Sequence, residues 1–481
     1  MIKPFKYAII GLVVVGVLAG ALITISHIHK KPDAKQQTET SESDKSILNL
    51  KKEDVDYISF HNSRGDFKVV VKSDESSYLD GMDVPSSSSA LDTLISNATS
   101  ITSTSEIGTN LADLSPYGLD KPDATFEVVT KKGDKHAFSL GIETPFKDGY
   151  YLLDKSTGKV HTINTSAERL AGVCYEEYVK TDLTQELTED NYSKINLMRV
   201  TNGAEKYPVI ELKTDNKKTA EKSNEDNQIE TSQYVITQPA GSLEVNSDYV
   251  SLYMQPSLAH ITAEKVVKIH PTATEKASLG LDKPYYALYY EIEGKGYGFK
   301  FSKPSENGEM NMMMDGIDVV YTVNKTNFTI LDTTLMGVQS RVLYLEYIDK
   351  IGSLTVSDST GTVTFQLSGS TQKDAKEPLK ATLNGKDVDT DSFKSLYMNA
   401  MSLYIEGELT SEDKPLKDVA TITFTYRDST SPVVLQYKEL DARRLAVSRD
   451  GNMRYYTLTK YIQQFLDNAH KLEKGEKVEF K

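Results

Sequence analysis

Five consecutive residues occur twice in this chain, and this repetition constrains the fold more than any other feature of the sequence. Residues 117–122 read YGLDKP and residues 279–284 read LGLDKP. In both strings the glycine tolerates a positive φ angle, the aspartate side chain can bond to nearby backbone, and the proline cannot donate to a strand ladder. The GLDKP string therefore predicts a turn that leads the chain into a β-strand.

A hairpin pattern follows each string. Residues 124–141 and residues 285–302 both contain two runs in which apolar and polar residues alternate, separated by a short segment with glycine. This pattern is typical of two antiparallel strands joined by a turn. Further strand patterns follow at residues 149–164 and 310–324, and each of them leads into a helical segment.

The similarity extends upstream of both strings, and a third, less similar copy fills the C-terminal part of the chain. There, EDKP at residues 412–415 stands where the other copies have GLDKP. Repetition on this scale predicts tandem modules. We therefore expect an α+β protein in which antiparallel β-hairpins pack with one or two helices in three modules, at residues 47–182, 183–340 and 341–481. The polar residues 214–233 predict a solvated loop.

The N-terminal segment has the pattern of a membrane anchor. Residues 7–25 contain no charged side chain, and a helix of this length spans about 30 Å of hydrocarbon. We expect residues 1–25 to form a cytoplasmic tip and a single transmembrane helix, and residues 26–46 to form a flexible stalk. A cleaved signal peptide, with the small residues 19–21 at the cleavage site, is the alternative.

The orientation of the anchor is not decided by charge alone. Lysines flank the apolar segment on both sides, so the positive-inside rule hardly distinguishes the two orientations. A long folded part after one N-terminal apolar segment is the usual arrangement of a surface-exposed protein. We therefore expect a single-pass protein of the cell membrane, with its N-terminus in the cytoplasm and its body outside.

The charge of the body argues against one class of partner. The whole chain has a net charge of -14, although lysines outnumber acids in residues 1–35. Binding to a phosphate backbone needs clustered lysine and arginine. We expect no nucleic-acid partner.

Two local patterns predict helices and their surroundings. Thr165 and Glu168 have the spacing of a helix capping box. Cys174 is the single cysteine of the chain, which excludes an intramolecular disulfide. We interpret Cys174 as a small core residue on a helix.

The sequence carries none of the motifs that identify common active sites. The eight histidines are scattered, and neither H-E-x-x-H, G-x-S-x-G nor the phosphate-binding G-x-x-x-x-G-K-[ST] occurs. His27 and His29 lie close together, but no further ligand residue is near them. We therefore expect no catalytic residue, no cofactor, no cofactor-binding residue and no metal ligand, and the protein is predicted not to be an enzyme.

Two short strings have both a functional and a structural interpretation. Arg64-Gly65-Asp66 spells an integrin-binding tripeptide, but it occupies the predicted turn of the opening hairpin, where a glycine is expected. One predicted strand carries four methionines: Met310, Met312, Met313 and Met314. Thioether groups can bind Cu(I), but packing of a strand is the simpler interpretation.

Tyrosines and a recurring SLYM string raise the same question. One predicted strand carries Tyr285, Tyr286, Tyr289 and Tyr290. Tyrosine buries a ring and keeps a polar hydroxyl, so this strand could form a binding face. Alternation places these side chains on both faces of the strand, so at least half of them are expected to be structural. SLYM occurs at residues 251–254 and 395–398, at the same place in two modules, which predicts helix packing.

Together, these residues resemble a known bacterial family. The order of hairpin, helix, YGLDKP turn, hairpin, GYY strand, KVHTIN strand and helix, over most of residues 47–340, is similar to the "domain of unknown function 4340" family. The third module departs from this pattern because Tyr-Gly-Leu is missing before residues 413–415. The resemblance implies a membrane-anchored protein linked to ABC transport systems of the gliding-motility type, and it implies no catalytic residue.

These observations lead to one functional expectation and two alternatives. We expect a noncatalytic interaction or scaffold protein outside the membrane, an accessory subunit of an ABC-type transport system with a transporter or envelope protein as its partner. One alternative is a cell-envelope hydrolase that acts on glycan or peptide. The other is a solute-binding protein, which would require a cleft between two lobes.

Overall fold

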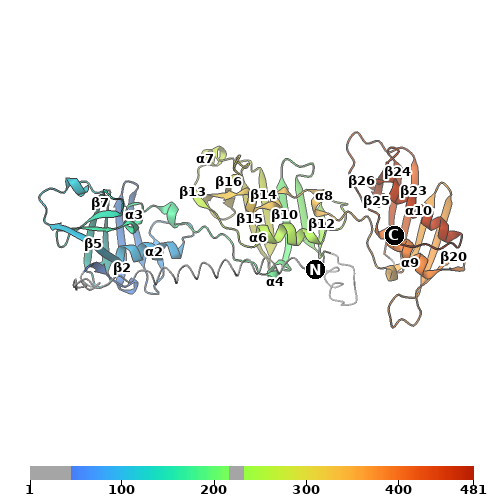
Figure 1. Cartoon of the computed structure of the whole chain (residues 1–481), viewed down its shortest axis with the longest axis horizontal. Helices are drawn as coiled ribbons and strands as arrows, with labels where there is room; N and C mark the ends of the chain where they lie inside the picture. Colours follow the sequence, from blue (N-terminus) through green and yellow to red (C-terminus); the bar gives the residue numbers. More distant parts are fainter. Residues whose placement is uncertain (1–44, 216–231, 429, 481) are drawn as a thin grey trace, which may run out of the picture. The chain divides into compact units, whose positions relative to one another are not determined.

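The computed structural model describes residues 45–215, 232–428 and 430–480, which form three antiparallel β-sheets together with a small number of helices (Figure 1). The class is therefore α+β, as the hairpin patterns predict. The strand pairs described within the three sheets are antiparallel, both between consecutive strands joined by short turns and between strands far apart in the chain.

The first sheet has nine strands in the order β1-β5-β9-β8-β7-β6-β2-β3-β4. Its strands are β1 (Ser46–Asn49), β2 (Val55–Asn62), β3 (Gly65–Val71), β4 (Ser77–Leu79), β5 (Ser100–Thr109), β6 (Ala124–Thr130), β7 (Lys135–Glu143), β8 (Gly149–Asp154) and β9 (Lys159–Asn164). Phe126 lies opposite Phe60 on β2 and Phe138 on β7, with ring centroids 6.0 Å and 5.0 Å away. Aromatic pairs of this kind stabilise a sheet and fix its register.

The second sheet has eight strands in the order β12-β11-β10-β14-β15-β16-β17-β13. Its strands are β10 (Ile195–Asn202), β11 (Val209–Thr214), β12 (Tyr234–Gln238), β13 (Lys265–Ile269), β14 (Tyr286–Ile292), β15 (Lys295–Phe301), β16 (Glu309–Met314) and β17 (Val319–Asn324). Alternation along β14 places Tyr286, Leu288 and Tyr290 in the core. Tyr290 also stacks on Tyr297 of β15, with ring centroids 5.0 Å apart.

The third sheet has nine strands in the order β21-β20-β19-β18-β23-β24-β25-β26-β22. Its strands are β18 (Ile351–Asp358), β19 (Gly361–Ser368), β20 (Lys380–Leu383), β21 (Lys386–Val388), β22 (Gly407–Glu408), β23 (Asp418–Tyr426), β24 (Val433–Glu439), β25 (Arg444–Arg449) and β26 (Asn452–Leu458). Its centre is apolar, since Leu354, Phe424 and Val433 lie side by side on β18, β23 and β24 and are all buried.

The three sheets share one strand order over their central part. In each, an early hairpin strand (β2, β10 or β18) pairs with the first strand of a later four-stranded meander. A strand from the intervening segment (β5, β13 or β22) then pairs with the last strand of that meander. The boundaries at residues 182/183 and 340/341 stay a prediction.

Helices are few in the described part of the chain, and three of these helices exceed two turns. The long helices are α2 (Ser88–Thr99), α9 (Thr390–Met401) and α10 (Thr459–Glu473), and the short ones are α3 (Glu168–Ala171), α4 (Glu189–Tyr192), α6 (Gln255–Leu258), α7 (Ala273–Ser278) and α8 (Leu335–Val338). Along α10, Ile462, Phe465, Ala469 and Leu472 are buried. This spacing of three to four residues places one face of the helix in the core. Helix α10 contacts α9 and strands β18, β19 and β26.

Both GLDKP strings form the predicted turn. Gly118 has φ +64° and ends a 3₁₀ turn at Ser115–Tyr117, and Gly280 has φ +73° and follows α7. Each glycine also lies close to the end of the second strand in the hairpin that follows it. Gly118 faces Ile142 in the first sheet, and Gly280 faces Ser302 in the second. The left-handed backbone at both positions is the conformation that glycine adopts at least cost.

Three local predictions need correction. Ser46, the last residue of the predicted stalk, begins β1, because its backbone pairs with Thr102 of β5. The side chain of Asn164, not that of Thr165, caps the turn at Thr165–Ala167 by accepting a hydrogen bond from the Ser166 N–H. Cys174 is buried as predicted, but it has an extended backbone and precedes the 3₁₀ turn Tyr175–Tyr178 instead of lying on a helix.

The predicted anchor at residues 7–25 and the stalk as far as residue 44 lie outside the described residues, as do residues 216–231 of the predicted loop. In the described part of the chain, no helix combines the length and the apolar character needed to cross a bilayer. The described residues also divide by their contacts into two compact units, one of residues 45–66 with 94–172, and the other of residues 67–93 with 173–215, 232–428 and 430–480.

Candidate functional site

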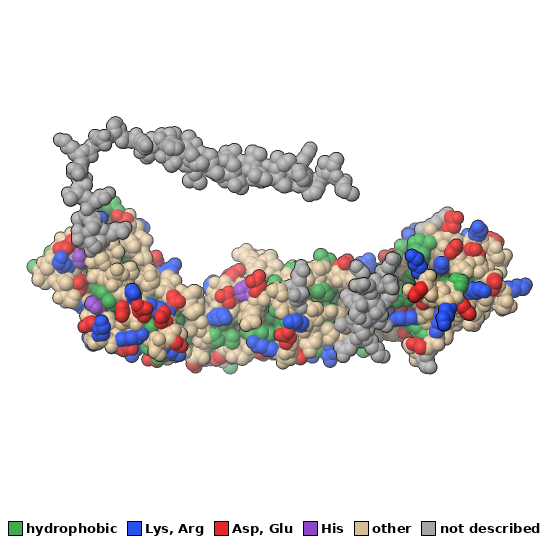
Figure 2. All heavy atoms as spheres, turned by 90° about the horizontal axis from the view of Figure 1, so that it is seen from below, with side chains coloured by type: hydrophobic (Ala, Val, Ile, Leu, Met, Phe, Trp, Pro, Cys, Tyr) green, Lys and Arg blue, Asp and Glu red, His purple; other side chains and the backbone are tan. Residues whose placement is uncertain are grey.

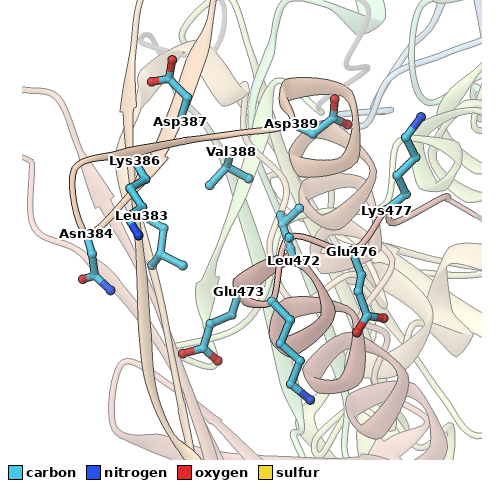
Figure 3. A pocket seen from close by; sticks show the side chains of 12 residues that line it. Leu383, Asn384, Lys386, Asp387, Val388, Asp389, Leu472, Glu473, Glu476 and Lys477 are labelled. Carbon is cyan, nitrogen blue, oxygen red and sulfur yellow. The ribbon is translucent and has the colours of Figure 1, made fainter.

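A pocket of about 600 Å³ lies in the third sheet, between the β20–β21 hairpin and the C-terminal end of α10. Figure 3 shows Leu383 and Val388 of the hairpin and Leu472 of the helix around the same space, with Asp387 and Lys477 pointing away at opposite edges. Two local structures, a tight turn and a helix end, shape this pocket.

The tight turn is the two-residue loop of the hairpin. Asn384 and Gly385 both have positive φ angles, 50° and 78°, as a two-residue turn with an Asn-Gly sequence requires. After β21 the chain enters α9, and Asp389 caps this helix by accepting a hydrogen bond of 2.9 Å from the Ser392 N–H. The hydrogen bonds from the Ser392 side chain and backbone lower the pKa of Asp389, so its carboxylate stays charged at the rim of the pocket.

The helix end is the last turn of α10. Gly475 has φ +78°, its N–H donates to Leu472 O at 3.1 Å, and the Glu476 N–H donates to Lys471 O at 2.9 Å. These two bonds form a Schellman motif, which satisfies carbonyls that the helix leaves open. The motif turns the chain back, so that residues 474–477 form a further wall of the pocket.

The pocket combines an apolar floor with charges of both signs. Its charged lining consists of Lys386, Lys474, Lys477, Asp387, Asp389, Glu473 and Glu476. Figure 2 shows the same mixture on the wider surface, where acidic and basic side chains are interspersed. An arrangement of this kind can pair with a ligand that carries both an ammonium and a carboxylate group, such as a chain terminus or an amino acid.

A histidine beside the pocket shares Glu473 with it. His470 Nδ1 lies 3.0 Å from Glu473 Oε2, and His470 Nε2 lies 2.9 Å from Asp358 Oδ2 and 2.7 Å from Thr360 Oγ1. Asp358 and Thr360 belong to the turn between β18 and β19, whereas His470 and Glu473 belong to α10. The cluster therefore joins the end of the helix to the sheet.

The geometry around His470 determines its protonation. A carboxylate can only accept, so each ring nitrogen that faces a carboxylate must carry a hydrogen. The Thr360 hydroxyl donates to Asp358 Oδ1 at 2.6 Å, so it accepts from His470. The hydrogen bond to Glu473 raises the pKa of His470, and burial lowers it. The hydrogen bond to Asp358 also raises this pKa, so the net effect is an increase. The two carboxylates therefore favour the protonated form of His470, which argues against a role as a general base.

This cluster makes the stability of the third sheet depend on pH. The pKa of His470 is higher in the folded chain than its unfolded value of about 6.5. Its contribution is therefore complete below about pH 6.5 and is lost as the pH rises through the folded-state pKa. His470→Asn is expected to lower the free energy of unfolding by about 1.5–3 kcal/mol at low pH and to remove most of this pH dependence.

Urea unfolding of the full chain across this pH range, followed by hydrogen exchange in β18 and α10, measures the effect. His136→Asn is the control, since His136 lies on β7 of the first sheet and should leave the profile of the third sheet unchanged. A pH profile that is the same with and without His470 would contradict this assignment.

The residues that the sequence singled out do not meet in this site. His27 and His29 lie outside the described residues. Gly65, with φ +133°, begins β3 directly after the turn that holds Arg64, as predicted for this hairpin. Met310 and Met312 are buried in the second core, while Tyr285 and Tyr289 are only partly buried.

The SLYM strings have different surroundings. Leu252 is 61% exposed on a π-helical turn at Val250–Met254, whereas Leu396 is buried on α9. Helix packing therefore explains Met254 and Leu396, but not Leu252. Among the described residues, no group of three or more histidine, cysteine, aspartate or glutamate side chains could hold a metal ion.

Sequence reasoning missed the cluster around His470. Two local signals are present: His470 and Glu473 are three residues apart on a helix, and residues 358–361 (DSTG) are typical of a turn. The contact between them spans 112 residues and depends on the pairing of strands in the sheet. The two local signals give no hint of that contact.

Three antiparallel sheets with one shared strand order define this chain as an α+β protein built from meanders. Residues 77–284 match the model of the family described as Domain of unknown function (DUF4340), which supports the resemblance found in the sequence. This range is shorter than the residues 47–340 over which the resemblance was expected. No curated protein and no solved structure gives a significant match to the chain.

Proposed function

We propose that this protein is a noncatalytic interaction or scaffold subunit, anchored in the cell membrane by residues 7–25, with its body outside the membrane. We further propose that it is an accessory to an ABC-type transport system. The shared strand order of the three sheets carries the proposal. Tandem units of one architecture give a chain several related surfaces, and linked contacts strengthen binding to a partner.

The surface chemistry of the third sheet supports a binding role. Its pocket combines an apolar floor with lysines and carboxylates, which suits recognition of a polar peptide or terminus. The histidine next to the pocket lies within hydrogen-bond distance of two carboxylates, which is the arrangement expected of a residue that stabilises the fold. The link to ABC transport rests on the family resemblance.

Purification of the tagged full-length chain from gently solubilised membranes tests this proposal. We expect a permease or an ATPase of an ABC-type system to be enriched relative to the untagged strain. Quantitative mass spectrometry of the bound proteins gives the measurement. If neither a transporter component nor another envelope protein is enriched, the proposed function is wrong.

One observation favours the hydrolase alternative. Thr360, His470 and Glu473 follow one another in the order of a nucleophile, a base and an orienting acid. Asp358 weakens this interpretation, because it holds a proton on the nitrogen that would have to accept one from Thr360. Hydrolysis of cell-wall glycan or peptide by the purified chain, and its loss in Thr360→Val, would favour the enzyme.

A further inference from the structure

The most exposed large apolar side chain among the described residues is Phe146, which is 89% exposed. It lies at the tip of the loop between β7 and β8 in the first sheet. We call residues 144–148 the Phe146 turn. Single exposed apolar residues are common on protein surfaces, so the question is whether the fold itself requires a phenylalanine here.

The Phe146 turn is held in one conformation. The Lys147 N–H donates to Thr144 O at 2.9 Å, the Asp148 N–H donates to Thr144 Oγ1 at 3.2 Å, and the Thr144 N–H donates to Gly149 O at 2.8 Å. Lys147 has φ +56°, a left-handed conformation that costs energy for any residue other than glycine. The phenyl ring is thus presented by a fixed backbone and loses little freedom on binding.

The second sheet forms a similar turn without an aromatic residue, although its loop closes one residue earlier, because the Ser305 N–H donates to Glu309 O at 2.9 Å. There the Gly308 N–H donates to Ser305 O at 3.0 Å, and the Glu309 N–H donates to Ser305 Oγ at 3.1 Å. Gly308, with φ +81°, takes the position of Lys147, and Asn307 therefore takes the position of Phe146. Because an exposed asparagine suffices in this turn, the phenylalanine is not needed for folding.

Two positions close in sequence to the Phe146 turn are apolar or aromatic in the first sheet and polar in the second. Ile142, at the end of β7, is 46% exposed and faces Gly118, where the second sheet has Ser302 facing Gly280. Tyr151 of β8 packs edge-to-face against Tyr117, with ring centroids 5.0 Å apart.

The position of Tyr151 also differs between the two sheets. Tyr151 pairs with Thr162 as Asn311 pairs with Thr322, so Asn311 is its counterpart in the second sheet. There, the side chain of Asn311 donates to Leu279 O at 3.1 Å. Polar positions of the second sheet are therefore apolar or aromatic in the first.

Acidic side chains outnumber basic ones around the Phe146 turn. The turn itself carries Lys147 and Asp148, whose charges offset each other, whereas Glu143 and Asp123 are exposed carboxylates. Burial and the charges of Glu168, Glu143 and Asp123 raise the pKa of Tyr150, which places these carboxylates near the start of β8. An acidic surface repels anionic lipid headgroups and attracts lysine and arginine. Charge complementarity thus favours a basic protein segment over a membrane surface.

We propose that the Phe146 turn is a docking surface for a segment of a partner protein in which lysine or arginine flanks an apolar side chain. This inference rests on the proposed function as an interaction protein and names the surface and the chemistry of its partner. The partner segment packs its apolar side chain on Phe146 and Ile142, and its basic groups pair with Glu143 and Asp123.

Photocrosslinking in intact cells tests the proposal. One variant of the full-length chain carries p-benzoylphenylalanine at position 146. The other carries it at position 307, which is the corresponding position in the turn of the second sheet. We expect a discrete crosslinked species at position 146 and none at position 307. Mass spectrometry is expected to map the crosslink to a partner segment with flanking lysine or arginine.

Charge reversal supplies the second readout. Glu143→Lys with Asp123→Lys should reduce the crosslink at position 146 by at least about fivefold, because two attractive charge pairs become repulsive. Both residues are exposed, so the thermal unfolding of the chain should change little. No crosslink at position 146, adducts with lipid only, or adducts with a second copy of this chain only would each overturn the proposal.

The experiment separates this inference from the proposed function. If the tagged chain still enriches a transporter component but position 146 gives no protein crosslink, the docking surface is wrong and the interaction role stands. If no partner is enriched and no crosslink forms, both are wrong. If the charge-reversed chain crosslinks as strongly as the original, the basic character of the partner segment is wrong.

Discussion

Replacement of Phe424 by alanine is expected to lower the free energy of unfolding of the third sheet by about 3–5 kcal/mol. Phe424 is fully buried near the C-terminal end of β23, between Leu354 and Val433 of the two neighbouring strands. Its ring stacks on Tyr344 with centroids 3.6 Å apart and contacts Tyr397 edge-on at 6.3 Å. Removal of the ring leaves a cavity between side chains that the sheet and α9 hold in place, so the site cannot collapse fully.

Hydrogen exchange in β18, β23 and β24 is the appropriate measurement, because a chain with several sheets does not unfold in a single two-state step. Thr425→Ala is the matched control. Thr425 is the next residue on the same strand but is exposed, so its loss should change the stability by no more than about 0.5 kcal/mol. Equal effects of the two substitutions would contradict the assignment of Phe424 to the core.

Alanine at Gly118 is expected to destabilise the first sheet by about 2–5 kcal/mol. A left-handed backbone costs alanine about 1–2 kcal/mol, and overpacking adds about 1–3 kcal/mol. The overpacking arises because the new methyl group would lie 2.6 Å from Ile142 Cγ2 and 3.0 Å from the Ile142 backbone nitrogen. The backbone nitrogen belongs to β7 and cannot move aside without disturbing the sheet.

Gly280→Ala provides the comparison for this prediction. Gly280 also has a left-handed backbone, but the nearest atom to its new methyl group is Ser302 Cβ at 3.2 Å. The cost should therefore approach the conformational term alone, about 1–2 kcal/mol. Hydrogen exchange rates in β6 and β7 measure the effect of Gly118→Ala. Hydrogen exchange rates in β14 and β15 measure the effect of Gly280→Ala. A larger cost at Gly280 than at Gly118 would contradict the packing described here.

Much of the fold follows from local sequence chemistry. The glycine of each GLDKP string has the positive φ that its turn requires, and the hairpins begin and end close to the predicted residues. These features depend on neighbouring residues, so a single sequence suffices to predict them. The prediction of the cap after β9 was wrong because Asn164 and Thr165 are both good capping residues. The residue at which the strand ends decides which of the two caps the turn.

The candidate sites were much less predictable. Asp358 meets His470 only because the end of α10 lies next to the β18–β19 turn, and no local pattern specifies that contact. The exposure of Phe146 is equally invisible in the sequence, where a phenylalanine next to a strand reads as a core residue. The correspondence of Phe146 with Asn307 is visible only in the hydrogen bonds of the two turns, because the two loops differ in sequence and in length.

The strands at the borders of the three sheets have a consequence for solubility. In the described part of the chain these are β1, β4, β12, β13, β21 and β22, and none of them exceeds the five residues of β12 and β13. A border strand exposes unpaired N–H and C=O groups to which another molecule can add a strand. Because these borders are short, neighbouring molecules find little template for joining sheet to sheet, even where many of them are crowded together.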